Sequence, residues 1–364
     1  LQRMTDMIAH RGPDSEGHYI DEHAALGHRR LSIIDLGGGQ QPIYNEDGSK
    51  VITFNGEIYN YQTLREELIA AGHTFTTKSD TEVLLHGYER WGVDLLQRVR
   101  GMFTFVIWDK NKQELFGARD HFGIKPFYYA KMNGTFMYAS EIKSLLRHPD
   151  FVKELNAEAL KPYMTFQYPA IGETFFKGVY KLPEGHYFTY RDGKMDIHRY
   201  YDEDFREGKQ KLGELVNSID QTVCDSVKAH QIADVEVGSF LSSGVDSSYV
   251  AAVARPQHTY SIGFGKGTYN ESQQAGELAE LLKLNNTAES LTDEEAFAAF
   301  PRIQWHLDEP DSNPSCVPLY FLSALAAKDV KVVLSGEGAD ELFAGYIDYG
   351  VHTKFLSLIH ISEP

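Results

Sequence analysis

Hydrophobic and polar positions alternate in short runs through the N-terminal half of the chain, a spacing typical of β-strands. The runs are rich in aromatic and β-branched residues, and they occupy residues 28–35, 50–61, 100–109, 112–120, 134–141 and 184–190. Helical spacing occurs in residues 1–8, before a break at Gly12 and Pro13, and again in residues 61–71. The pattern predicts a β-rich α+β domain rather than alternating parallel strands and helices.

The pattern changes in residues 200–214, where aromatic residues give way to charged ones before a helix predicted over residues 215–229. Beyond it, the chain twice presents a buried strand, a loop of small residues and a helix, over residues 235–254 and again from residue 331. Strands connected in this way form parallel sheets. We therefore expect two domains, residues 1–205 and residues 206–364, the second an α/β domain with a Rossmann-like parallel sheet.

The loop of the first strand-loop-helix unit carries residues suited to binding phosphate. It contains Ser242, Ser243, Gly244, Ser247 and Ser248. Serine hydroxyls add donors to the N–H groups at a helix start, and glycine allows close approach. Asp246 would repel a phosphate unless a cation lay between them, so we expect Mg²⁺, which Asp340 in the second unit could share.

The plain alternative is that these serines and the glycine only cap a helix. A second loop of the same type, residues 335–338, argues against it, because ligands of parallel sheets lie beyond the carboxyl ends of the strands. The sequence has no G-x-x-x-x-G-K-[ST] motif, and "GEGADE" departs from G-x-G-x-x-G at its last position. A P-loop and a dinucleotide fingerprint are therefore excluded.

The motifs "SSGVDSS" and "SGEGADE" together resemble the PP-loop synthetase domain of glutamine-hydrolysing asparagine synthetases. The resemblance implies that ATP adenylates aspartate and that ammonia then displaces AMP. It implies Glu337 as a catalytic acid, Asp246 and Asp340 as magnesium ligands, and residues 308–315 as a loop near the amino-acid substrate. The ATP and pyrophosphate residues that it implies are Leu241, Ser242, Ser243, Gly244, Asp246, Ser247, Ser248, Ile262, Ser335 and Gly336.

Four motifs of the N-terminal half, "HRGPD", "NGEIYN", "KSDTEV" and "RDHFGIKPFYY", resemble the glutaminase domain of class II amidotransferases. The implied fold is an N-terminal-nucleophile sandwich. By this resemblance Arg30 binds the glutamine carboxylate, Asn55 and Gly56 form the oxyanion hole, and Glu57 and Asp80 hold the amino group. Taken singly, "NGEIYN" would be a tight turn and Arg30 a surface cation. Met102 matches a position that lines the family's ammonia tunnel, although a core methionine fits equally well.

The glutaminase resemblance fails at the first residue. Class II glutaminases use an N-terminal cysteine, whereas this chain starts at Leu1 and has only Cys224 and Cys316. We expect a fragment, truncated at both ends and inactive as a glutaminase. The family would place its N-terminal strand upstream, and a catalytic lysine with further helices downstream. Residues 356–364 no longer resemble the family.

Composition excludes several other classes of protein. The 364 residues are 42% hydrophobic and carry a net charge of −17, so a nucleic-acid surface is not expected. Two cysteines without a C-x-x-C motif suggest a reducing cytoplasm, and no apolar run is long enough for a membrane span. The expected partners are small molecules, namely aspartate, glutamine and ATP. The sequence leaves open whether the protein forms a homodimer.

Three hypotheses remain. The first is asparagine synthesis through β-aspartyl-AMP with glutamine as the nitrogen donor. The second is a related PP-loop amidotransferase or cyclase, similar to β-lactam synthetase, that adenylates another carboxylate. The third is a non-catalytic paralogue, which we disfavour because both acidic loops are intact.

Overall fold

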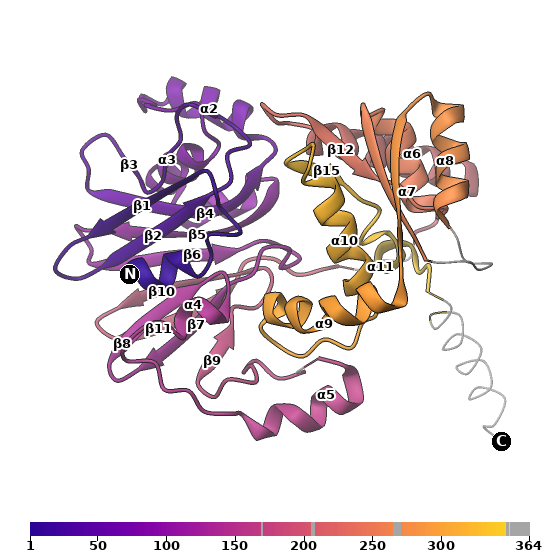
Figure 1. Ribbon diagram of the computed structural model, residues 1–364. Coiled ribbons are helices and arrows are strands. Elements are labelled where there is room, and N and C mark those ends of the chain that lie inside the picture. The colour runs from indigo at the N-terminus through magenta and orange to yellow at the C-terminus, as the bar shows by residue number, and fades with distance from the viewer. Residues whose placement is uncertain (169, 205–207, 265–270, 347–348, 350–364) are drawn as a thin grey trace, which may run out of the picture. The chain divides into compact units, whose positions relative to one another are not determined.

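The computed structural model describes residues 1–168, 170–204, 208–264, 271–346 and 349, and these form two compact units (Figure 1). The first unit comprises Leu1–Leu215 together with Pro301–Asn313. The second comprises the described residues of Val216–Phe300 and those from Pro314 onward. The predicted boundary at residues 205/206 lies shortly before the main segment of the first unit ends, and no sequence signal marks the later segment that joins it.

The first unit is built on a six-stranded antiparallel sheet in the order β11-β10-β6-β5-β4-β3. A hairpin of β1 and β2 and a three-stranded sheet in the order β8-β7-β9 complete its strands. Their bounds are β1 Ser15–Ile20, β2 Ala25–Arg30, β3 Ile43–Tyr44, β4 Lys50–Ile58, β5 Gly101–Asp109, β6 Glu114–Arg119, β7 Tyr128–Met132, β8 Thr135–Ala139, β9 Val179–Lys181, β10 His186–Arg191 and β11 Lys194–Arg199. The helices are α1 Gln2–Asp6, α2 Tyr61–Ala70, α3 Thr81–Trp91, η1 Gly92–Gln97, α4 Ile142–Leu145, η2 Ala157–Ala159 and α5 Leu160–Phe166.

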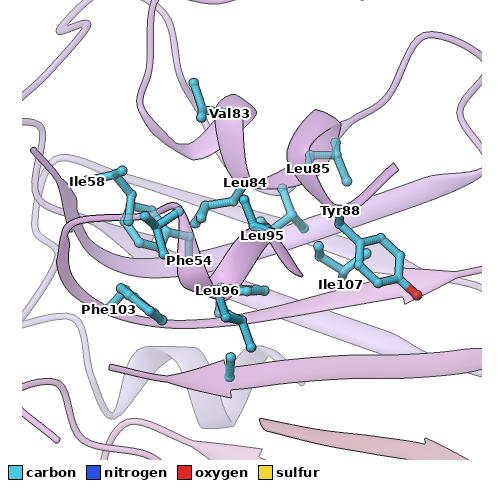
Figure 2. Packing of buried hydrophobic residues seen from close by; sticks show 14 of the residues in the cluster. Phe54, Ile58, Val83, Leu84, Leu85, Tyr88, Leu95, Leu96, Phe103 and Ile107 are labelled. Atoms are coloured by element: carbon cyan, nitrogen blue, oxygen red, sulfur yellow. The ribbon is translucent and has the colours of Figure 1, made fainter. Parts of the chain in front are cut away.

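Period-two alternation in β4 and β5 makes two cores, one on each face of this sheet. On one face, Phe103, Phe105 and Ile107 pack with side chains of α2 and α3. Figure 2 shows this cluster, in which Leu84 of α3 lies beside the strands. On the other face, Val106 and other strand residues pack with β1, β2 and β8. Burial of each such side chain contributes about 1.5–3 kcal/mol. The unit is therefore an α+β sandwich, as the alternation predicts.

The strand predicted over residues 28–35 ends early, at Arg30. The Arg30 guanidinium donates hydrogen bonds to the carbonyl oxygens of Ile34 and Asp35, at 2.8 and 2.9 Å. A chain whose carbonyls converge on one side chain must curl around it, and it cannot continue a flat ladder. The alternation of apolar residues in this segment therefore reflects which side chains are buried, although the backbone is not an extended strand.

The second unit contains a four-stranded, wholly parallel sheet in the order β14-β13-β12-β15. The strands are β12 Val237–Phe240, β13 His258–Phe264, β14 Asn285–Leu291 and β15 Val332–Leu334. The helices of this part of the chain are α6 Leu212–His230, α7 Val245–Ala254, α8 Glu271–Leu282, α9 Asp293–Leu307, α10 Cys316–Ala326 and α11 Ala339–Phe343. The start of α6, up to Leu215, and the second half of α9, from Pro301, belong to the first unit. Helices lie on both faces of the sheet, with α10 on one face and α7 and α8 on the other (Figure 1). The predicted α/β parallel sheet is confirmed.

Among the helices of the described segments, none combines the length and the apolar character needed to cross a bilayer. The tail at residues 356–364, which no longer resembles the family, lies outside the described residues.

Candidate active sites

The first unit contains a cavity of about 870 Å³ that brings together all five predicted glutamine-binding residues. They come from three separate segments: the end of β2, the second half of β4, and the residue before α3. The residues are Arg30, Asn55, Gly56, Glu57 and Asp80. Alternation along β4 explains part of this convergence, because Asn55 and Glu57 lie on the face opposite Phe54 and Ile58, which belong to the helix-side core.

Arg30 is a rigid part of the cavity wall. Its side chain is buried, and it donates to the carbonyl oxygen of Gly38 at 2.5 Å as well as to those of Ile34 and Asp35. Burial lowers the pKa of Arg30 from its usual value, although nearby carboxylates oppose this effect. A guanidinium fixed in this way keeps its charge and its orientation, which suits it to pairing with a carboxylate.

Gly56 occupies a position that no other residue can fill. A Cβ atom at this position would collide with the Met102 carbonyl oxygen and would lie 2.7 Å from the Phe103 Cα, on the neighbouring strand β5. The backbone φ of +156° further disfavours a side chain. Because Gly56 has no side chain, the backbone of β4 can lie close against β5 at this position, next to Asn55, which faces the cavity.

Three buried polar atoms of the cavity lining have no hydrogen-bond partner among the described residues. They are His28 Nδ1, Asn55 Nδ2 and Glu57 Oε1. Buried polar atoms are normally satisfied, and each such exception costs free energy. A donor, an acceptor and a carboxylate oxygen without protein partners, in residues that line one cavity, fit a ligand that is itself both donor and acceptor.

Two acidic residues of the cavity lining, Glu57 and Asp80, have raised pKa values. Burial, reinforced by the charge of Asp80, raises the pKa of Glu57 to about 7. Burial also raises the pKa of Asp80 to about 6, although Ile58 N donates to its carboxylate at 2.9 Å. An ammonium group placed between the two carboxylates would relieve both costs. The pair is therefore suited to receive a cation, and its role in holding the glutamine amino group stays a prediction.

Sequence reasoning missed three further residues that line this cavity, Lys125, Ser79 and His28. Lys125 lowers the pKa of Glu57 through its charge, and burial lowers its own pKa. Lys125 lies inside the motif "RDHFGIKPFYY", and this position could have indicated that it belongs to the glutamine site. Met102 also lines the cavity, while its place along an ammonia tunnel stays a prediction.

In the second unit, the two predicted phosphate-binding loops lie against each other. They follow β12 and β15, which are parallel neighbours with Ser239 paired to Leu334. A Cβ atom on Gly336 would lie 2.7 Å from the Ser247 nitrogen and 2.9 Å from the Asp246 Cβ. The second loop therefore touches the first turn of α7, and the glycine is what permits the contact.

The serines of the first loop shape it through their own hydrogen bonds. The Ser242 and Ser247 hydroxyl oxygens lie 2.8 Å apart, and the Gly244 nitrogen donates to Ser242 Oγ at 3.0 Å. Ser248 Oγ donates to the Gly244 carbonyl at 2.6 Å, while Ser243 is exposed. The first loop is thus already curved around the start of α7.

Hydrophobic contacts anchor the flanks of this loop. Leu241 is buried against Ala251 of α7, and Ile262 lies half-buried in the next strand, β13. Loop geometry is therefore set by the sheet behind it.

The acidic residues lie in the first turns of the two helices that follow these loops. Asp246 is in the first turn of α7, and Asp340 is in the first turn of α11. The Asp340 carboxylate packs against Gly345, where a Cβ atom would collide with it. Glu337 is exposed, and its backbone nitrogen donates to Ser335 Oγ at 3.4 Å. Sequence reasoning missed Gly345, although it lies in the stretch "LFAGY" that follows the acidic motif.

The loop predicted near the amino-acid substrate, residues 308–315, begins inside the first unit. Asp308 pairs with Lys143 at 2.9 Å, and Glu309 pairs with Lys181 at 3.6 Å. Both carboxylates therefore have structural partners, and a role of this loop at the substrate stays a prediction.

The two cysteines lie in helices of the second unit and form no disulfide. Cys224 is half-buried in α6, with its sulfur 3.7 Å from the Tyr249 hydroxyl, and Cys316 begins α10.

Comparison with known proteins assigns each part of the chain to a family. Residues 1–201 match the family of glutamine amidotransferase domains, and residues 218–359 match the asparagine synthase family. Asparagine synthetase [glutamine-hydrolyzing] 1 of Bacillus subtilis is 46% identical over 354 residues, which are 96% of this chain and 56% of that protein. A putative asparagine synthetase [glutamine-hydrolyzing] 2 of Methanocaldococcus jannaschii is 34% identical over 378 residues, covering 96% of this chain and 73% of its own length. This chain belongs to the glutamine-hydrolysing asparagine synthetase family.

Asparagine synthetase relatives extend beyond this chain. A putative asparagine synthetase [glutamine-hydrolyzing] of Mycobacterium tuberculosis is 40% identical over 376 residues, which cover 96% of this chain but 57% of that protein. The chain thus spans little more than half the length of the first relatives that it matches. The glutamine amidotransferase match precedes the asparagine synthase match along the chain, which is the order that the sequence motifs predict.

Proposed function

We propose that this chain carries two sites of an enzyme that makes asparagine from aspartate, ATP and glutamine. In the second unit, the β-carboxylate of aspartate attacks the α-phosphorus of ATP, giving β-aspartyl-AMP and pyrophosphate. In the first unit, water hydrolyses the side-chain amide of glutamine, so that the C–N bond breaks and glutamate and ammonia form. Ammonia then attacks the activated carbonyl carbon, and AMP leaves with the bonding electron pair.

The contact of Gly336 with the start of α7 carries this proposal. It brings Ser335 and Gly336 beside Asp246 and Ser247, so donors from two loops face one place at the carboxyl ends of parallel strands. Serine hydroxyls and the N–H groups that open α7 fit a polyphosphate. Such a site requires no basic side chain, in keeping with a chain whose net charge is −17.

Asp246 and Asp340 supply the hard oxygen donors that Mg²⁺ prefers. The ion, when bound, neutralises phosphate charge and so favours departure of pyrophosphate. Glu337, exposed beside Ser335, is available to handle protons at the acceptor site.

The first unit supplies the glutamine-binding half of the proposal. Arg30 would pair with the glutamine carboxylate, while Glu57 and Asp80 would hold its ammonium group and thereby relieve their own burial. Asn55, with its unpartnered amide, and Gly56 would stabilise the oxyanion. Neither cysteine of this chain lies in the first unit, so the described residues supply binding and stabilising groups and no thiol nucleophile.

The finer expectations belong to the same proposal. The α+β sandwich would be of the N-terminal-nucleophile class, and the reaction would take place in the cytoplasm. Residues 1–205 and 206–364 would be its two functional domains.

Pyrophosphate release from ATP tests the proposed function. In a complete protein, release should require aspartate, and asparagine and AMP should accumulate when ammonium or glutamine is supplied. Gly336→Ala should raise the Kd for Mg-ATP by about tenfold or more, because the new Cβ must displace backbone of α7. Gly276→Ala in α8, where a Cβ atom meets no neighbour, is the matched control and should leave that Kd unchanged.

Two results would contradict the proposal. Bound Mg-ATP without aspartate-dependent release would indicate another carboxylate as the acceptor. Equal effects of Gly336→Ala and Gly276→Ala would mean that the loop contact does not form the nucleotide site.

A further inference from the structure

Four side chains that neither proposed site uses converge where the segments that follow β3 and α2 meet α3. Glu46 follows β3, His73 follows α2, and His86 and Glu89 lie three residues apart on α3 (Figure 1). Residues three apart on a helix share one face, so His86 and Glu89 project together. One ligand atom from each of the four residues lies within 4.8 Å of the others.

The separations of these atoms fit ligands of a shared ion, and His86 Nδ1 is also within hydrogen-bond distance of Glu89. His86 Nδ1 lies 3.2 Å from a Glu89 oxygen and 3.4 Å from a Glu46 oxygen. His73 Nδ1 lies 3.4 Å from Glu46 and 3.9 Å from Glu89. Charge-assisted hydrogen bonds are about 2.7–2.9 Å long. Ligands about 2.0–2.1 Å from a tetrahedral ion lie about 3.3 Å from one another.

A second layer of contacts orients these side chains. His86 Nε2 faces Glu82 Oε1 at 3.4 Å, and Glu82 is itself fixed by the Thr76 and Thr77 nitrogens, each at 2.7 Å. Asn45 donates to Glu89 Oε1 at 2.7 Å. A histidine whose second nitrogen meets a carboxylate, beside a carboxylate that is itself hydrogen-bonded, is the usual outer layer of a metal site.

Charge and burial also favour a cation. The His86 side chain is fully buried, and those of His73 and Glu89 are only 18% and 17% exposed. Three carboxylates, from Glu46, Glu82 and Glu89, surround the two imidazoles, and Lys50 is 3.4 Å from Glu89. An excess of negative charge at partly buried positions is costly unless a cation compensates it.

We propose that Glu46, His73, His86 and Glu89 form a four-coordinate site for a divalent transition-metal ion, and that zinc is the ion that fits best. Two imidazoles and two carboxylates suit zinc, and four protein ligands make a closed structural site rather than a catalytic one. The ion joins α3 to the loops that follow β3 and α2. Asp80, immediately before α3, lines the glutamine cavity, so the metal also steadies that end of the cavity.

A proton is the competing occupant. Burial lowers the pKa of His86, but the hydrogen bonds to Glu82 and Glu89 and the charge of Glu46 outweigh it and raise that pKa to about 9. The alternative is therefore a protonated His86 held by carboxylates without a metal. Only the first alternative predicts stoichiometric metal binding, and this binding can be measured without an assay of catalysis.

Titration of tag-free, chelator-treated protein with Zn²⁺ alone, followed by calorimetry, tests the site. One Zn²⁺ should bind per chain, and the unfolding temperature should rise with Zn²⁺ concentration. Co²⁺ in its place should give the intense visible absorption of a tetrahedral complex. Glu46→Gln and His73→Asn should each weaken Zn²⁺ binding by about tenfold or more, as should Glu82→Gln in the outer layer.

Glu66→Gln is the matched control, since Glu66 is an exposed acid on α2 outside the cluster, and it should bind Zn²⁺ like the parent protein. Glu46 is the most exposed of the four ligands, at 36%, so its variant should fold. Two results would overturn the proposal: equal Zn²⁺ binding by folded Glu46→Gln, His73→Asn and Glu66→Gln, or no stoichiometric binding while His86 holds a proton at pH 8 by NMR.

Discussion

At the residue scale, burial raises the pKa values of Glu57 and Asp80 in the cavity of the first unit. The motif "NGEIYN" pointed to Asn55, Gly56 and Glu57, and the structure places all three in one cavity lining. The raised pKa of Glu57 could not be foreseen, because it depends on burial and on Asp80, which lies in a different motif. Lys125 was missed for the same reason, since its neighbours are defined by folding.

Glu57→Gln should stabilise the ligand-free protein at pH 8 and leave its stability unchanged at pH 4. The folded-state pKa is about 7 against an ordinary value of 4.5, so the folded protein binds the extra proton between these pH values. Ionisation therefore costs stability as pH rises through this window, and the cost is complete above it. The gain at pH 8 should approach about 3 kcal/mol. Urea unfolding measures it, and an equal gain at both pH values would contradict the assigned burial effect.

At the element scale, hydrophobic alternation predicted most strands of the first unit, and the strand-loop-helix pattern predicted the parallel sheet. The strand over residues 28–35 was predicted too long, because Arg30 gathers the carbonyl groups that follow it. The second half of α9 and the following loop were assigned by sequence to the second domain. Their place in the first unit depends on ion pairs between distant residues, which no local pattern reveals.

Lys143→Met should destabilise the first unit by about 3 kcal/mol, because it leaves the buried carboxylate of Asp308 without its cation and leaves Glu141 with only Arg11 and His10 beside it. Lys143 is 4% exposed and lies 2.5 Å from Glu141 and 2.9 Å from Asp308. Lys177→Met is the matched control, since its pair with Glu154 is exposed on both sides and should contribute less than about 1 kcal/mol. Chemical unfolding compares the two variants, and limited proteolysis should cut residues 301–313 faster in Lys143→Met. Equal stability of the variants would show that the buried pair does not hold this segment.

At the scale of the whole molecule, the two units have different architectures and carry separate candidate sites. The first is an antiparallel sandwich with a cavity lined by carboxyls and Arg30, and the second is a parallel sheet with two adjoining loops. Family resemblance predicted both halves and their order, because the motifs lie within single loops and strands. The placement of residues 301–313 in the first unit and the histidine-carboxylate cluster at α3 both depend on contacts between residues distant in sequence. No local motif therefore predicts either of them.

The central claim is that each unit holds its own active site. Measuring both activities in two variants, one for each site, tests it most directly. In a complete protein, Asp246→Ala should abolish aspartate-dependent pyrophosphate release and leave glutamine binding measurable. In the same complete protein, Glu57→Ala should weaken the use of glutamine and spare synthesis from ammonium. Loss of both activities in either variant, with the fold intact, would contradict the account that each unit holds its own site.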